Sequence, residues 1–260
     1  MKIFNSCLVK SPSNPLGVDL KNFPESTIIV HRNITCQHLN KVKADSLTSS
    51  SLSPKLIRCA AKHTIGKQIV TAEVQNHLEQ ISTADGLPPH LDLYIGAPVV
   101  LRNRNISQEL RITNGAQGIV RGILKEMSPG SCSSYATVAL VEFVSSPVKL
   151  SHLPTGYFPI TPITSRIRAS MHNPLTSSSF SILALRHQLP IQLAFAITSH
   201  GVQGKTLSHI TADITVKKEG IAYVAASRAR TRHGLAITKE ATSLAQLNCP
   251  LPKDLLEETR

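Results

Sequence analysis

Two stretches in the last third of the 260-residue chain decide its fold: LPIQLAFAITSHGVQGKTL at residues 189–207 and IAYVAASRAR at residues 221–230. The first contains a continuous apolar run over 191–198, typical of a buried strand, and continues into a helix or turn with two glycines. The second predicts a helix. Further strands are predicted at 210–214 and 234–238. This alternation of strand and helix predicts an α/β layer with a parallel sheet.

The first part of the chain adds a strand and two helices. Residues 27–30, TIIV, predict a short buried strand. The apolar positions at roughly helical spacing after it are Ile34, Leu39 and Val42. A second helix is predicted over 70–81, with Val70, Val74, Leu78 and Ile81 on one face. The prolines at 88 and 89 end it, because proline lacks the amide donor.

The middle of the chain has the alternation and turn signals of β structure. Strands are predicted at 97–101, 118–124 and 136–144, and Asn114-Gly115 is a strong turn dipeptide. We expect a small barrel or a curled sheet here. Serine-rich stretches at 46–53 and 177–181 predict surface loops that divide the chain into three parts.

The composition favours a polyanionic partner. The chain has 28 Lys and Arg against 16 Asp and Glu, a net charge of +12. Residues 161–260 alone hold 12 of the basic and 6 of the acidic side chains. Such an excess is typical of proteins that bind nucleic acid or an anionic membrane face. With no Trp and 4% aromatic residues, a broad base-stacking platform is not expected.

No membrane, targeting or metal signal is visible in the sequence. The longest apolar runs, such as 191–197, are far shorter than the roughly 20 residues of a membrane span. We expect a soluble protein without a membrane partner, located in the nucleus of a eukaryotic cell, with the mitochondrion as the alternative. The five cysteines form no CxxC pair, which predicts reduced thiols and no metal site.

The segment SHGVQGKT at 199–206 invites comparison with a phosphate-binding loop. A Walker A loop needs a glycine where this chain has Ser199, and Gly201 is two residues out of register. A strand that runs into a glycine-containing turn still presents free backbone amides to an anion, so some phosphate contact is expected. An independent nucleotide-binding protein that uses Gly204, Lys205 and Thr206 is one open hypothesis.

Arginines follow the second stretch. Arg228 and Arg230 end the predicted helix, and Arg232 lies close behind. A guanidinium at such a place can clamp phosphate oxygens and stabilise transferred phosphoryl charge. The alternative is a solvated basic helix end that complements the helix dipole.

Together these segments resemble the carboxy-terminal half of the PIF-type and Helitron-type DNA helicases of superfamily one. Residues 189–207 are similar to that family's motif V, which reads close to LPLxLAxAxTIHKSQGQTL, and YVAASR at 223–228 is similar to motif VI, YVALSR. Residues 86–103 with Asn-Gly at 114–115 resemble the block GLPPHxLxLxxGxPVMLLRN…NG. Residues 29–40 resemble a degenerate motif IV.

The resemblance implies a RecA-like second motor domain, a parallel sheet flanked by helices, with an inserted small SH3-like β-barrel. It divides the chain into an unassigned N-terminal segment (1–26), the first part of the motor domain with a helical insert (27–90), the barrel-like insert (91–160), the remainder of the motor domain (161–245) and a C-terminal tail (246–260).

The resemblance also implies roles for single residues. Arg228 would be the arginine finger, a catalytic residue that reaches a nucleotide held by another motor domain. The residues expected to contact nucleotide are Gln203, Gly204 and Arg32, or the adjacent Asn33 in place of Arg32. Those expected to contact single-stranded DNA are Thr198, His200 and Lys205.

Two departures from the family pattern shape the hypothesis. The chain has Gly201-Val202 where the family has Lys-Ser, and Lys205 replaces a usual glutamine. The sequence contains no Walker A or Walker B motif, so ATP and Mg²⁺ would be bound mainly by an N-terminal motor half, in cis or in trans. We therefore expect the C-terminal portion of an ATP-dependent 5′-to-3′ DNA helicase, inactive alone. The alternative is an inert nucleic-acid-binding module or a transposon-derived relic.

Overall fold

A computed structural model divides the chain into two units. The first unit combines Met1–Asn40 with Phe195–Arg260, and the second is Lys41–Ala194. The structure describes residues 7, 26–49, 55–66, 68–79, 87–88, 90–127, 134–172, 179–214 and 221–238. Among these residues no helix has the length and apolar character needed to cross a membrane.

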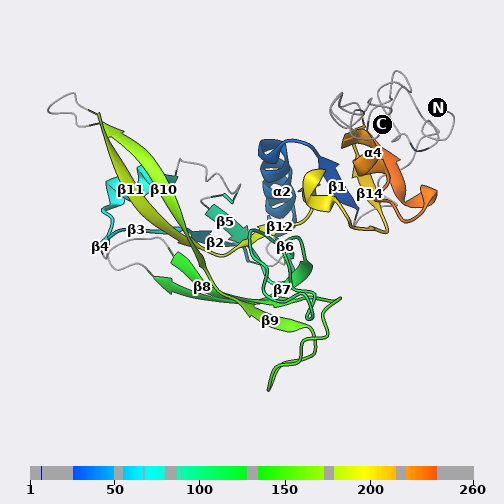
Figure 1. Ribbon diagram of the computed structural model, residues 1–260, viewed down its shortest axis with the longest axis horizontal. Helices are drawn as coiled ribbons and strands as arrows, with labels where there is room; N and C mark the ends of the chain where they lie inside the picture. Colours follow the sequence, from blue (N-terminus) through cyan, green and yellow to red (C-terminus); the bar gives the residue numbers. More distant parts are fainter. Residues whose placement is uncertain are drawn as a thin grey trace, which may run out of the picture. The chain divides into compact units, whose positions relative to one another are not determined.

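The first unit is built on a four-stranded sheet in which every pair of neighbours is parallel. In order across the sheet its strands are β13 (Ala196–Thr198), β1 (Thr27–Val30), β14 (Ile210–Ala212) and β15 (Leu235–Ile237). Figure 1 shows β1, from the start of the chain, beside β14, from its last third. The sheet confirms the predicted α/β layer and three of its predicted strands.

The helical segments of this unit lie between the strands. They are α2 (Asn33–Thr48), which continues into the second unit, α4 (Ile221–Ala226), and the 3-10 turns η2 (His200–Val202) and η3 (Arg232–Gly234). The helix predicted over 221–230 is therefore wrong in its second half. Leu207 donates its amide to Arg228 O and accepts from the amide of Arg230, and this pairing replaces helical hydrogen bonds.

Helix α2 covers the outer edge of the sheet through a side chain that the apolar pattern did not select. The Asn40 amide nitrogen donates to Ala196 O at 2.9 Å, and Asn40 Oδ1 accepts from Ala196 N at 2.8 Å. The buried Cys36 packs with Ala196 and Leu39. Ile34 and Val42, two of the apolar residues at helical spacing, are 74% and 50% exposed. The Asn40 side chain thus forms hydrogen bonds with the backbone groups of the edge strand β13, and this determines which face of α2 packs on the sheet.

The strand predicted over 191–198 is interrupted after Ala194. Its first part, β12 (Ile191–Leu193), pairs antiparallel with β6 (Pro98–Leu101), whereas its second part, β13, pairs parallel with β1. The Ala194 amide donates to Pro98 O, and Phe195 O accepts from the amide of Ile28. Adjacent residues therefore have their hydrogen-bond partners in different sheets.

The middle block forms a five-stranded antiparallel sheet in the second unit. Its order is β12, β6, β7 (Gln117–Met127), β8 (Ser134–Glu142) and β9 (Tyr157–Ile160). The three strands predicted here are confirmed, and Gly115 in the predicted turn has φ +86°. The sheet lies within the second unit, which begins after Asn40 and ends after Ala194.

Two further sheets complete the second unit. One has the order β10 (Ile163–His172), β11 (Ser179–Gln188), β3 (Lys62–Ile65) and β4 (Gln68–Ile69), and the other pairs β2 (Ile57–Ala60) with β5 (His90–Leu93). Helix α3 (Ala72–Glu79) confirms a helix within 70–81, and Leu78 packs in the core as predicted. Ile81 lies outside the described residues. The β10–β11 hairpin was not predicted, and Ser179–Ser181 begin a strand, not a loop.

Candidate nucleotide and nucleic-acid site

Three of the candidate residues follow the carboxyl ends of neighbouring parallel strands in the first unit. Arg32 follows β1, Thr198 ends β13, and His200 comes two residues later. The register sets Thr198 beside Val30, and Ser199 N donates to Val30 O at 2.7 Å. Loops at this edge of a parallel sheet are the usual place for ligand-binding residues. Arg32 and His200 are exposed, as a surface contact with an anion requires.

The turn after β13 is tight. The Gly201 amide donates to Thr198 Oγ1 at 3.3 Å, and the Lys205 amide donates to Val202 O at 3.0 Å. Val202 is fully buried, so the position at which the family pattern has serine contributes to the core here. Gly204 has φ +77° and open space where a Cβ would stand. Glycine suits this position because of its backbone conformation, and apart from its two chain neighbours no atom of the described residues lies within 4 Å of the place where a Cβ would stand.

The turn after α4 holds Arg228 against the segment that contains Lys205. Arg228 Nε donates to Val224 O at 2.9 Å, and Arg228 Nη2 donates to Ser227 Oγ at 2.7 Å. Arg228 Nη1 donates to Lys205 O at 3.4 Å. Leu207 and Ala229 form a parallel bridge that joins the two segments. The residues of the two most specific sequence motifs therefore contact each other.

A glycine that sequence reasoning did not select as functional fixes this junction. A Cβ built on Gly234 would lie 2.0 Å from Ser208 O, far inside van der Waals contact. Residues 207–208 are thereby held between the turn after α4 and the turn before β15. The only sequence signal was a glycine at the first position of a predicted strand, which equally suits many loops.

The structure thus arranges five of the seven candidate residues in two groups. Arg32, Thr198 and His200 lie around the ends of β1 and β13, and Lys205 and Arg228 meet near the Leu207–Ala229 bridge. The exposed Gln203 and Gly204 are in the turn between. The described part of this unit is strongly basic, with one carboxylate, Asp213, among five cationic side chains: Arg32, Lys205, Arg228, Arg230 and Arg232.

This donor set suits phosphate oxygens, not a metal ion. Guanidinium, ammonium and backbone amide groups are hydrogen-bond donors, whereas Mg²⁺ needs oxygen ligands such as carboxylates. Among the residues that the structure describes, no three His, Cys, Asp or Glu side chains gather as metal ligands would.

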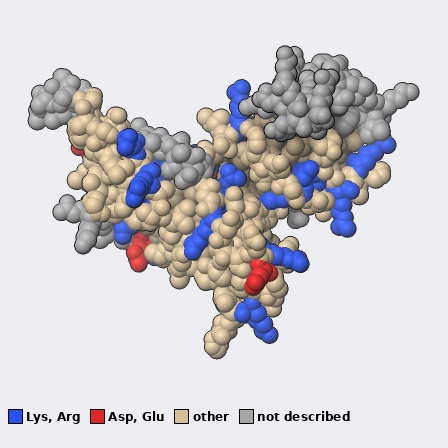
Figure 2. Space-filling model, in the orientation of Figure 1, with Lys and Arg blue, Asp and Glu red and all other residues tan. Residues whose placement is uncertain are grey.

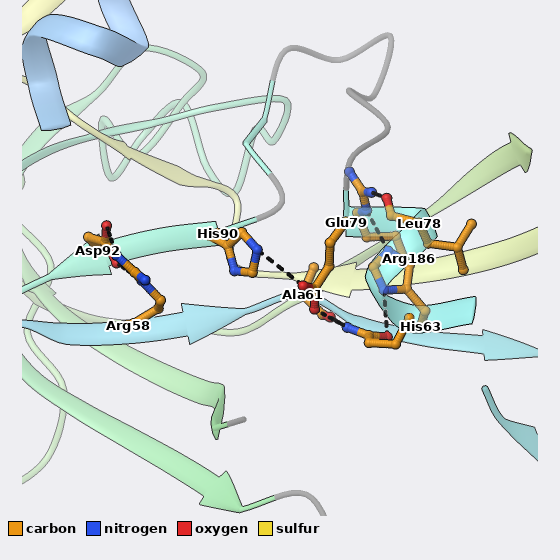
Figure 3. Close-up of polar contacts among 9 residues, drawn as sticks. Arg58, Ala61, His63, Leu78, Glu79, His90, Asp92 and Arg186 are labelled. Atoms are coloured by element: carbon orange, nitrogen blue, oxygen red, sulfur yellow. Dashed lines mark hydrogen bonds and ion pairs between the residues drawn. The ribbon is translucent and has the colours of Figure 1, made fainter. Parts of the chain in front are cut away.

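The second unit contains a buried polar network of a different kind (Figure 3). Arg186 is fully buried; its Nε donates to His63 Nε2 at 2.8 Å and its Nη2 donates to Leu78 O at 2.6 Å. His63 Nδ1 lies 2.9 Å from Gln75 Oε1, and Gln75 donates to Ala61 O. Since His63 Nε2 accepts from Arg186, the ring is neutral with its proton on Nδ1.

Burial determines the electrostatics of this network. Desolvation lowers the pKa of His63 to about 4, and the Gln75 hydrogen bond offsets only part of that shift. Desolvation also lowers the pKa of Arg186 to about 10, still far above neutral. Glu79 opposes the shift of the Arg186 pKa, and its Oε2 lies 3.1 Å from His90 Nε2. The hydrogen bonds of the network join β3, β11 and α3, because Arg186 contacts both His63 and Leu78, and Gln75 contacts His63.

Solved structures define the class of the fold. A Pif1 helicase from Candida albicans matches with a TM-score of 0.57 and 19% identity, over 98% of this chain and 52% of that one. A Bacteroides Pif1 bound to single-stranded DNA matches with a TM-score of 0.55 and 20% identity, over 91% and 45%. The chain therefore has the fold of a part of a DNA helicase.

Sequence comparison agrees with this class. The ATP-dependent DNA helicase PIF1 of Danio rerio is 30% identical over 159 residues, and the human PIF1 is 32% identical over 163; each match covers 61% of this chain. No family model matches. The chain spans about a fifth of the length of these curated relatives, 21% in both. The resemblance to PIF-type helicases that the motifs indicated is confirmed.

Proposed function

We propose that this chain is the second motor portion of an ATP-dependent 5′-to-3′ DNA helicase, with a RecA-like sheet in its first unit and an SH3-like barrel in its second. It supplies the arginine finger and part of the single-stranded DNA track. An N-terminal motor half, in cis or in trans, supplies the Walker motifs and holds most of the ATP and Mg²⁺. In a eukaryotic cell such a protein acts in the nucleus.

The observation that carries this proposal is the junction of the two motif segments. Arg228 donates to the carbonyl of Lys205, and Leu207 pairs with Ala229. A helicase must couple its nucleotide site to its DNA site, and a direct contact between the two segments supplies a physical connection. Because Arg228 is anchored through Ser227 and Val224, its charge has a defined position when a nucleotide arrives.

The remaining candidate residues divide between contacts with the nucleotide and contacts with DNA. Arg32, Gln203 and Gly204 contact the nucleotide, since they offer a cation, an amide and an open backbone. His200 and Lys205 contact DNA phosphates, and the predicted DNA contact Thr198, which is buried, holds the turn before them through the Gly201 amide. When bound between the two halves, the magnesium nucleotide provides the phosphoryl group that is transferred to water. Arg228 stabilises the charge that develops on that group.

The test joins this chain to the N-terminal motor half of a PIF-type helicase and measures DNA-stimulated ATP hydrolysis. We expect turnover in the joined protein, and a loss of about a thousandfold or more for Arg228→Ala, as for arginine fingers generally. Arg230→Ala is the matched control, because Arg230 is exposed and close in sequence. Equal losses for both variants would contradict the assignment, and helicase-like turnover by the chain alone would contradict the need for a second half.

A further inference from the structure

The β10–β11 hairpin has two faces of opposite character. Its strands pair without interruption from Ile163–Gln188 to His172–Ser179, and β3 pairs with the other edge of β11. Side chains alternate between the two faces. On one face Ile167, Ala169, Ala184 and Arg186 are buried. The opposite face is open to solvent.

We define the hairpin face as Arg166, Arg168, Leu183, Leu185, His187 and Lys62. The register places Arg166 opposite Leu185, Arg168 opposite Leu183, and His187 opposite Lys62. Both arginines are exposed, and Leu183 is 54% exposed. The face thus combines three cations with two aliphatic side chains and contains no carboxylate.

Local contacts keep His187 neutral and in place. Its Nδ1 lies 2.8 Å from Thr164 Oγ1, and its Nε2 lies 3.3 Å from Thr64 Oγ1. Burial and the nearby Lys62 lower the pKa of His187. The charge on the hairpin face at neutral pH therefore comes from Arg166, Arg168 and Lys62.

The two arginines are not neutralised within the described part of the chain. Neither guanidinium makes an ion pair or a hydrogen bond with a described residue. They stand two residues apart on one strand, about 6.8 Å along its axis. Figure 2 shows Lys and Arg side chains on the part of the molecule that Figure 1 labels β10 and β11. Like charges held side by side on a rigid strand repel each other, and a polyanion would relieve that repulsion.

We propose that the hairpin face is a second nucleic-acid-binding surface, which holds the phosphate backbone of duplex DNA. Arginine donates paired hydrogen bonds to phosphate oxygens, and the exposed Leu183 covers sugar surface. Surfaces that bind single strands combine basic residues with aromatic stacking, and the hairpin face has no Phe, Tyr or Trp. The surface lies in the second unit and does not depend on the motor role assigned to the first.

The test measures fluorescence anisotropy of the complete chain with a labelled 20-base-pair duplex and with the corresponding single strand, at several salt concentrations. We expect Arg166→Ala with Arg168→Ala to weaken duplex binding about tenfold or more. Each lost phosphate contact reduces the slope of the logarithm of the binding constant against the logarithm of the salt concentration by about 0.9. Lys41→Ala with Lys43→Ala removes the same charge from exposed positions on α2 and is expected to change duplex affinity less than twofold.

Three results would overturn the proposal: equal weakening by the two double variants, unchanged duplex binding by the arginine variant, or weakening confined to the single strand. Arg166→Lys with Arg168→Lys should retain most of the salt dependence, because lysine keeps the charge. If duplex binding fails these tests while Lys205→Ala still weakens single-strand binding, the surface is refuted and the proposed function is not. Since the altered side chains are exposed, circular dichroism is expected to show unchanged folding.

Discussion

The two units place their charged side chains on different kinds of structure. In the first unit the cations are on turns between short, buried parallel strands, and close backbone contacts fix those turns. In the second unit long antiparallel strands carry arginines on both faces: Arg186 is buried in a hydrogen-bonded network, and Arg166 and Arg168 are exposed. The charged residues of the first unit are therefore positioned by close backbone contacts, and the buried arginine of the second unit is positioned by side-chain hydrogen bonds.

The largest effect is expected where backbone fit is tightest. In Gly234→Ala the new methyl group would meet Ser208 O at 2.0 Å, so the backbone must move. We expect a loss of several kcal/mol of stability, as for severe overpacking. Hydrogen-exchange mass spectrometry should show lost protection in β14 and β15.

The matched control is a glycine of the second unit. In Gly122→Ala the new methyl group would be 3.5 Å from Leu140 Cβ, an ordinary contact. We expect a change within about 1 kcal/mol, since alanine has the lower conformational entropy in the unfolded chain. If Gly122→Ala lowered the free energy of unfolding as much as Gly234→Ala, the two units would not differ in how tightly their backbone packs.

The second unit should respond to pH through His63. Its pKa is about 4 in the folded chain and about 6.5 when unfolded, so the unfolded chain takes up a proton first on acidification. This contribution to stability is complete above pH 6.5 and is lost as the pH falls towards 4. A shift of this size corresponds to about 3 kcal/mol.

Urea unfolding at pH 7 and pH 4.5 measures that loss. His63→Gln should flatten the pH dependence, because glutamine does not titrate. His38→Gln, at an exposed position of α2, should keep the full dependence. Identical pH profiles for the two variants would show that another group is responsible.

The same contrast explains what could be predicted from sequence. Strands β1, β6, β14 and β15 are short segments rich in apolar residues, and this local pattern identified them. The break between Ala194 and Phe195 was missed because it depends on partners almost a hundred residues or more away, Pro98 and Ile28. No property of the run itself marks that position.

The hairpin was missed for a side-chain reason. Arg186 points into the core, while Phe180 and Leu183 are 49% and 54% exposed. Polar and apolar residues therefore do not alternate as a half-buried strand requires. At the candidate site, motif resemblance selected Lys205 and Arg228, but the contact between them uses the Lys205 carbonyl, which is present in every residue type.

The smallest effect is expected for an exposed ion pair of the second unit. Arg58 and Asp92 face each other across β2 and β5; Arg58 Nε donates to Asp92 at 2.8 Å, yet the Arg58 side chain is 61% exposed. We expect Arg58→Ala to cost less than about 1 kcal/mol in urea unfolding, and still less in 1 M salt, because water and ions screen the pair. A larger cost would mean that exposed arginines in this unit support the fold. In that case a loss of duplex binding by the Arg166 and Arg168 variants would have to be separated from unfolding. A small cost instead allows that loss to be interpreted as binding alone.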